Sequence, residues 1–203
     1  MNKLIITLLA FATGTTVSVS AQQPPAMPNM NDYQDALNAI GQMMQTQSSN
    51  TTELVNFRQL KALLPASLDG MKRTNASGEK TGGFGMTVAF AEADYEGDDG
   101  SRISIKITDG SAMGPMLAMS HAAWSNMEID RESDTEMEQT FKHKGHKALK
   151  RFNFEDEDGE VNMIIDSRFI LEVAGFRTTL EALMAALEKI DLDALLSLEA
   201  PAE

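Results

Sequence analysis

The chain has no cysteine among its 203 residues. Disulfide bonds and cysteine nucleophiles are therefore excluded, and the stability of the fold has to come from a packed core. The serine-hydrolase motif G-x-S-x-G and the metalloprotease motif H-E-x-x-H are absent as well. None of these three kinds of catalytic site is expected.

Positive charge is also scarce. Lysine and arginine together number 17 against 30 aspartate and glutamate residues, which gives a formal net charge of -13. Nucleic acids and anionic membranes attract proteins through clustered positive charge. The composition therefore argues against nucleic acid and membrane surfaces as partners.

Long apolar runs are missing except at the start of the chain. Lys3 precedes an apolar stretch from Leu4 to Ala12, and the small residues Val19-Ser20-Ala21 follow. This order is typical of a secretory signal peptide over residues 1–21, because the stretch is too short to span a bilayer. We predict a periplasmic or secreted protein that begins at Gln22 and has no integral membrane segment after cleavage.

The rest of the chain divides by composition. Residues 22–55 contain the proline-bearing stretch QQPPAMPNM and the polar stretch TQSSNTT, which predict a linker that holds one short helix from Asp32 to about Gln45. We expect a single domain over residues 56–198 and a tail over residues 199–203. Asn56 is expected to cap a short helix that buries Leu60, Leu63 and Leu64.

The first half of this domain contains one strand pair whose register can be predicted. Placing Tyr95 opposite Ile103 brings Ala93 to Ile105 and Ala91 to Ile107. On the other face Glu96 then meets Arg102, and Glu92 meets Lys106. Two opposite-charge pairs follow from a register chosen on apolar residues, which supports that register. A preceding strand at 71–77 is expected to end in a glycine-rich loop at 78–85.

The second half predicts a meander of three hairpins with turns at Lys144-Gly145, at 156–159 and at 166–168. The expected pairs, all on one face, are Phe141–Ala148, Phe154–Val161, Phe152–Met163, Ile165–Phe169 and Met163–Leu171.

Helices are expected before and after this meander. One should cover 113–127 and bury Met116, Ser120, Ala123, Trp124 and Met127. The other should begin at the capping box Thr178-x-x-Glu181, line one side with Leu180, Leu183, Met184, Leu187 and Ile190, and be followed by a turn through Leu195 and Leu198. The expected fold is α+β: an antiparallel sheet of about six or seven strands with two main helices packed on one face.

The stretch FKHKGHK (141–147) places two of the three histidines close together. With a turn at Lys144-Gly145, His143 and His146 lie opposite each other and could share Zn²⁺ or Cu²⁺. A zinc site needs three or four protein ligands, however, and nothing nearby in the sequence supplies a third. We therefore interpret the stretch as the end of a hairpin. His143 and His146 remain a weak alternative metal site, and we assign no metal and no cofactor.

Methionine is the most unusual residue in the composition, with 14 in the chain. The spacing Met113-x-x-Met116-x-x-Met119 could suggest copper binding, since thioethers are soft ligands for Cu(I). A step of three residues along a helix rotates away from one line, so these sulfurs do not converge. Filling of an irregular core is the favoured interpretation, although Met27 and Met30 lie in the linker.

Three further motifs are weak. S-x-x-K and K-T-G overlap in residues 77–82 and share Lys80, whereas penicillin-recognising enzymes take them from separate elements. Ser133-Asp134-Thr135 only approximates the third motif of those enzymes. The acidic run 156–160 is too short for an EF-hand loop. We interpret all of these as structural, and we name no catalytic residues.

Several short motifs carry a resemblance. They are Leu63-Leu64-Pro65 with Leu68-x-Gly70, Ala91-x-Ala93-x-Tyr95, Gly145-His146-Lys147-Ala148 and Asp166-x-Arg168-Phe169. Over residues 57–198 the chain resembles a family of small, uncharacterised exported bacterial proteins that brings no activity with it. The order of sheet and helices also looks like the Mog1/PsbP type of fold, whose members are accessory or binding modules. This likeness implies a non-catalytic module that binds a protein or an envelope component. A periplasmic copper- or zinc-binding protein is the alternative.

Overall fold

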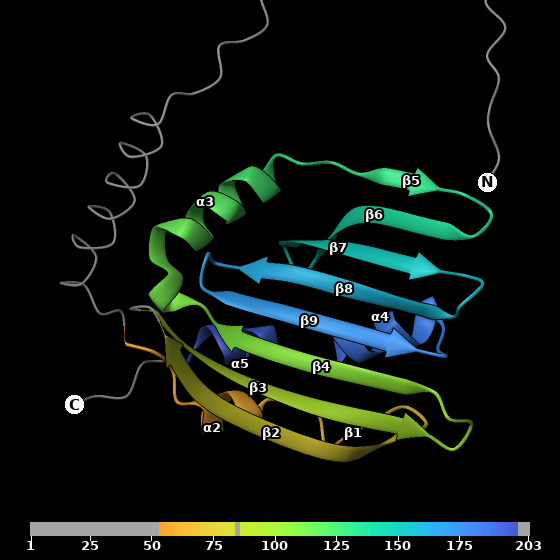
Figure 1. The fold of residues 1–203 in the computed structure, drawn as a ribbon, viewed down its shortest axis with the longest axis horizontal. Coiled ribbons are helices and arrows are strands. Elements are labelled where there is room, and N and C mark those ends of the chain that lie inside the picture. Colours follow the sequence, from red (N-terminus) through yellow and green to blue (C-terminus); the bar gives the residue numbers. More distant parts are fainter. Residues whose placement is uncertain (1–52, 84–85, 199–203) are drawn as a thin grey trace, which may run out of the picture. The chain divides into compact units, whose positions relative to one another are not determined.

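A computed structural model describes residues 53–83 and 86–198, and Figure 1 shows its fold. The predicted signal peptide, the expected helix at 32–45 and the tail lie outside the described residues. The strands are β1 (Ser67–Leu68), β2 (Met71–Gly83), β3 (Met86–Gly97), β4 (Arg102–Asp109), β5 (Asp130–Glu132), β6 (Glu136–His143), β7 (His146–Asn153), β8 (Asp158–Ile165) and β9 (Phe169–Phe176). The helices are α2 (Phe57–Ala62), the 3-10 turn η1 (Ser111–Met113), α3 (Gly114–Ser125), α4 (Leu180–Glu188) and α5 (Leu192–Leu196).

All of these strands belong to one antiparallel sheet in the order β1-β2-β3-β4-β9-β8-β7-β6-β5. The first four strands form a meander. The chain then crosses through η1 and α3 to the far edge and returns as a second meander, so that β9 pairs with β4. The last strand therefore lies in the middle of the sheet, next to the end of the first meander.

The two faces of the sheet differ in what covers them. Side chains on alternate residues of a strand point to opposite faces. One set packs against α2, α4 and α5, which Figure 1 shows behind the sheet, and we call this the covered face. Its buried members include Ala89, Ala91, Ala93 and Tyr95 of β3, Ile103, Ile105 and Ile107 of β4, and Phe169, Leu171 and Val173 of β9. The opposite set forms the open face, where Leu149 is the only buried residue among the described strand positions.

Both predicted strand registers next to a short turn are confirmed. β3 and β4 pair Tyr95 with Ile103 and Glu96 with Arg102. β6 and β7 pair Phe141 with Ala148 and His143 with His146. β8 and β9 pair Ile165 with Phe169 and Met163 with Leu171, also as predicted.

The short helix α2 also forms as predicted. The side chain of Asn56 accepts a hydrogen bond from the backbone N–H of Arg58 at 2.9 Å. Leu60 and Leu64 are buried in the core, and Leu63 packs against it. Pro65 follows the helix and cannot continue it.

The expected fold class is wrong. The sheet has nine strands rather than six or seven, and the described part of the chain is mainly sheet with short helices. The strand number was underestimated because β1 and β5 are short and lack the alternation of apolar residues that marks a half-buried strand. Two main helices on one face are not found either, since α3 does not lie behind the sheet with α2, α4 and α5 (Figure 1).

The predicted buried stripe of the helix at 113–127 is also wrong. Ser120 and Ala123 of α3 are exposed, as is Met127 just beyond its end, and the side chain of Trp124 is half-buried. The side chain of Met116 lies outside the described part of the structure. Leu117 is buried instead, beside Gly110, where a Cβ atom would lie 2.7 Å from Leu117 Cδ2. In its described part the helix therefore buries Leu117 at the end of β4, and it also makes polar contacts, such as that of His121 Nδ1 with Ser167 Oγ of the β8–β9 turn at 2.7 Å.

The predicted turn at 156–159 is displaced. Phe152 pairs with Gly159, and Ala148 pairs with Met163, so the expected pairs Phe154–Val161 and Phe152–Met163 are wrong. The turn occupies 154–157, because the side chain of Asn153 accepts hydrogen bonds from the backbone N–H groups of Glu155 and Asp156, both at 2.9 Å. A slip of four residues keeps every side chain on its face, so apolar alternation cannot detect it.

Two local expectations fail for non-local reasons. The glycine-rich loop at 78–85 is mostly strand, since β2 continues to Gly83; a Cβ at Gly78 would lie 2.9 Å from Phe57 Cδ2, so the glycine makes room for α2. The cap of α4 is Thr179, whose side chain accepts from the N–H of Ala182 at 3.1 Å. Thr178 is buried, and its N–H donates to the carbonyl oxygen of Glu157.

Candidate functional site

The hairpin interpretation of FKHKGHK is confirmed. Lys144 and Gly145 have φ angles of 47° and 86°, so both lie in the left-handed region that a two-residue hairpin turn of type I′ requires. The two histidines face each other across this turn, on the side of the covered face. Lys144 Nζ donates to the carbonyl oxygen of Ile190 at 3.1 Å, which fastens the hairpin to the end of α4.

His143 is the only histidine buried in the described part of the chain. Its Nδ1 atom lies 3.3 Å from Glu188 Oε1, and its buried Nε2 atom has no hydrogen-bond partner. Burial lowers the pKa of His143 below its ordinary value, and the nearby carboxylate of Glu188 opposes this shift. A neutral imidazole is therefore favoured at this position.

The histidine pair does not gain a third ligand of the usual kinds. Within residues 53–83 and 86–198, no three histidine, aspartate or glutamate side chains gather closely enough to hold a metal ion. The methionines divide: Met71 and Met163 are buried in the core as predicted, whereas Met119 and Met127 are exposed. Met27 and Met30 lie outside the described residues.

The enzyme-like motifs do not come together. Ser77 and Lys80 are exposed on β2, and because they are three residues apart in a strand they point to opposite faces. Ser133, Asp134 and Thr135 connect β5 to β6 at the other edge of the sheet. The motifs are therefore unrelated in space.

A buried carboxylate, Asp109, serves the fold. It is completely buried at the end of β4 and accepts hydrogen bonds from the backbone N–H groups of Val55 at 2.8 Å and Ser111 at 2.9 Å. The guanidinium of Arg168 lies 3.4 Å from its Oδ2 atom and also donates to the carbonyl oxygen of Leu198. Asp109 thus joins the beginning of the described chain, η1, the β8–β9 turn and the end of α5.

The open face carries a shallow groove over the ends of β3, β4 and β9. The residues that line it are Thr74, Asp94, Tyr95, Glu96, Arg102, Ile103, Ser104, Ala174, Gly175 and Phe176. The guanidinium of Arg102 lies over the ring of Phe176 at 5.0 Å, and 47% of Phe176 is exposed. This is a cation–π pair at the surface.

Tyr95, which lines the groove, is fixed by a hydrogen bond on the covered face of the sheet. The hydroxyl of Tyr95 points to the covered face and donates to the carbonyl oxygen of Pro65 at 2.8 Å; burial raises the pKa of Tyr95 to about 12. At the rim, Asn75 Nδ2 donates to Asp94 Oδ2 at 3.2 Å next to a bulge between Arg73 and Asn75. The groove is therefore built on paired strands rather than on loops.

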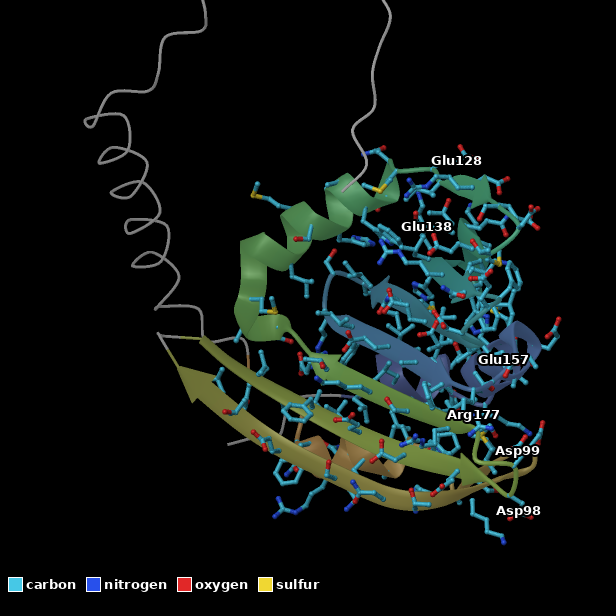
Figure 2. The ribbon with its side chains drawn as sticks, turned by 45° about the vertical axis from the view of Figure 1, so that its right-hand side comes forward. Asp98, Asp99, Glu128, Glu138, Glu157 and Arg177 are labelled. Atoms are coloured by element: carbon cyan, nitrogen blue, oxygen red, sulfur yellow. The ribbon has the colours of Figure 1, made fainter. Side chains whose placement is uncertain are left out.

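Acidic loops lie at the same end of the sheet. Figure 2 shows Asp98, Asp99, Glu157 and Arg177 together there. The hydroxyl and N–H of Ser101 donate to Asp99 Oδ1, and these bonds lower the pKa of the Asp99 carboxyl. The loops thus place negative charge beside a groove whose own cation is Arg102.

A row of alternating charges crosses the other half of the open face. Arg151 Nε lies 2.8 Å from Glu138 Oε1, and Arg151 Nη1 lies 3.0 Å from Glu160 Oε1. Arg131 pairs with Glu138 from β5. The hydrogen bond from Arg151 lowers the pKa of Glu138. These ion pairs satisfy one another. Exposed aromatic surface on this face is found at Phe176 in the groove, while the half-buried Phe90 lies under Lys106 elsewhere on the face.

Only part of the groove lining could be predicted from the sequence. The pairing of Glu96 with Arg102 was predicted from β3 and β4. Phe176 was missed, because it reaches Arg102 through the pairing of β4 with β9, which joins two meanders that are distant in sequence. Its one signal was a large aromatic residue at the open-face position that ends a strand.

No helix in the described part of the chain combines the length and the apolar character that crossing a bilayer demands. Comparison with family models, with curated proteins and with solved structures finds no match to this chain.

Proposed function

We propose that the protein is an exported, non-catalytic module that binds a partner protein or an envelope component through the groove on its open face. The exposed pair of Phe176 and Arg102 is the observation that carries this proposal. Aromatic residues and arginine are the side chains most often responsible for affinity at protein interfaces. Export is inferred from residues 1–21.

The shape of the groove favours a macromolecular partner. Sites for small molecules are mostly deep clefts that bury most of the ligand. This groove is shallow and open along paired strands, so a protruding segment of a partner can lie in it. Asp94 and Ser104, which pair across β3 and β4, add polar groups to the lining of the groove.

Site-specific photocrosslinking in the native cells tests this proposal. A photoreactive phenylalanine analogue at position 176 should give one discrete adduct, and Arg102→Ala should weaken its formation about tenfold. Phe154 is the matched control, because it is an exposed phenylalanine of similar accessibility, 42% against 47%. Equal adducts from both positions, or none from position 176, would refute the proposal. The measured mass of the isolated protein should also equal that of a chain that begins at Gln22.

The alternative function is copper or zinc binding. The observation that favours it is the placement of His143 directly opposite His146 on one face of the hairpin. Calorimetric titration with Cu(I) and with Zn²⁺ separates the two functions. Micromolar or tighter 1:1 binding that disappears in His143→Ala would establish the metal function in place of the groove.

A further inference from the structure

Among residues 53–83 and 86–198, no strand neighbours the outer edge of β2 over most of its length. β3 pairs with β2 from Met71 to Gly83, whereas β1 pairs only with Met71 and Lys72 on the other side. From Asn75 to Gly83 the register with β3 is uninterrupted. Figure 1 shows this stretch as the free border of the sheet. About half of its backbone N–H and C=O groups point outward, where another strand can bond to them.

The opposite edge is protected. β5 is three residues long, and all three, Asp130, Arg131 and Glu132, are charged and exposed. Short, charged edge strands discourage pairing with another chain. β2 has small side chains instead, among them Ala76, Gly78 and Gly82, and its bulge lies at one end only. The two edges therefore differ in their capacity to accept a strand.

The region that includes α2 and β2 carries a surplus of positive charge within an acidic protein, whereas the free stretch itself contains one lysine, Lys80, and one glutamate, Glu79. Residues 57–83 contain five basic residues, Arg58, Lys61, Lys72, Arg73 and Lys80, and two acidic ones, Asp69 and Glu79, a net charge of +3 in a chain of -13. The side chains of Arg58, Lys61 and Lys80 are exposed, and none of them forms an ion pair with a described carboxylate. An acidic partner would be attracted to this edge and repelled by most of the remaining surface.

We propose that the free edge of β2, from Asn75 to Gly83, binds an extended acidic segment of a partner protein as an additional strand of the sheet. Backbone hydrogen bonds supply the affinity in this mode of binding, and the flanking charges supply the preference. The proposal concerns a surface separate from the groove, and neither depends on the other.

A second copy of the chain is a poorer occupant. Pairing β2 with β2 brings no surplus of opposite charge to either edge, since each free stretch contains one lysine and one glutamate and each edge is flanked by the basic residues of α2. Pairing β2 with the acidic β5 of another copy matches charge, but it offers three residues and a head-to-tail contact that does not close. An acidic segment from a different protein meets neither obstacle.

Peptide binding to the full protein provides the test. The probe is a fluorescein-labelled, nine-residue peptide in which threonine alternates with glutamate. Fluorescence anisotropy should show saturable binding that weakens at least tenfold when alternate backbone nitrogens of the peptide are methylated, or when lysine replaces glutamate. Lys80→Glu should weaken binding at least fivefold. Lys142→Glu, at an exposed lysine of β6, is the matched control and should bind as the unchanged protein does.

Amide hydrogen exchange by NMR locates the bound peptide. We expect the peptide to slow exchange at alternate residues between Asn75 and Gly83 at least tenfold, since only the outward-facing amides gain a partner. No binding up to millimolar peptide, equal binding of the methylated peptide, or slowing at Phe176 and Arg102 instead would overturn the proposal. Protection of β2 that grows with protein concentration and without peptide would show a second copy at the edge, and would overturn it as well. Absence of the crosslink at position 176 would refute the proposed function of the groove and would leave the proposal for the β2 edge unaffected.

Discussion

The two faces of the sheet are made of the same strands but serve different purposes. On the covered face, Ala91 and Ala93 of β3 lie opposite Ile107 and Ile105 of β4, and α4 packs over β8 and β9 with Leu183 and Leu187 completely buried. On the open face the same two strands present Glu92 opposite Lys106 and Glu96 opposite Arg102. Burial of apolar area stabilises a fold far more than exposed ion pairs do. The covered face therefore holds the fold, and the open face is free to contact a partner.

The largest effect is expected from truncation of a leucine on the covered side. Leu187→Ala removes a completely buried side chain from α4 and should lower the free energy of unfolding by about 2–5 kcal/mol. Ile170→Ala, at a half-buried position of the open face, should cost less than half as much. Urea unfolding of both variants measures the difference, and equal losses would contradict the assignment of the faces.

The second effect concerns Asp109, a carboxylate that is buried on the covered face. Asp109→Ala leaves the Arg168 guanidinium and the N–H groups of Val55 and Ser111 without their acceptor, so we expect a loss of about 3 kcal/mol. Asp98→Ala, at an exposed loop carboxylate, is the control and should change stability by less than about 0.5 kcal/mol. A loss in Asp109→Ala as small as that of the control would show that this network is dispensable.

The third effect is a pH dependence at the edge of the covered face. Because burial holds the pKa of His143 below its ordinary value of 6.5, the unfolded chain takes up this proton at higher pH than the folded protein does. The contribution to stability is complete above about pH 6.5 and decreases as the pH falls below that value. His143→Gln should flatten this part of the stability curve, whereas His146→Gln should keep it. Chemical unfolding at several pH values between 5 and 8 provides the measurement, and the same slope in all three proteins would contradict the burial argument.

The smallest effect is expected on the open face. Glu138→Gln weakens the row of ion pairs with Arg151 and Arg131, which are exposed to solvent and salt, so the melting temperature should fall by only about one degree at neutral pH. Because the pKa of Glu138 is lowered, the difference between the two proteins should disappear as the pH falls through that pKa. Glu136→Gln, on the same strand, serves as the control. A fall of five degrees or more in Glu138→Gln alone would mean that the open face helps to hold the fold.

Local rules predicted the parts of the fold that local rules decide. The register of β3 and β4 follows from the alternation around Ala91 and Ala93 together with two opposite-charge pairs. The turn at Lys144-Gly145 follows from its length and its glycine. The helix cap at Asn56 is likewise predicted from the residues that follow it. Each of these features depends on residues that are close in sequence.

The remaining features depend on contacts between distant segments. Gly78 lies where Phe57 packs against β2, so this glycine does not indicate a loop. The backbone N–H of Thr178 donates to the β7–β8 turn, and the residue that caps α4 is Thr179 instead. The pairing of β4 with β9 has no local signal, so the groove around Phe176 could be predicted only in part. The free edge of β2 was missed for the same reason, since its exposed side chains do not alternate as those of a half-buried strand do.

The free energy of unfolding of a triple variant on the open face tests the division between the faces most directly. Phe90→Ser, Arg102→Ser and Phe176→Ser together remove two aromatic rings and one cation from this face. We expect urea unfolding to show a total loss below about 1.5 kcal/mol, clearly less than that of Leu187→Ala alone. A loss equal to or larger than that of Leu187→Ala would show that the open face is part of the structural core, and the proposed binding surface would have to be abandoned.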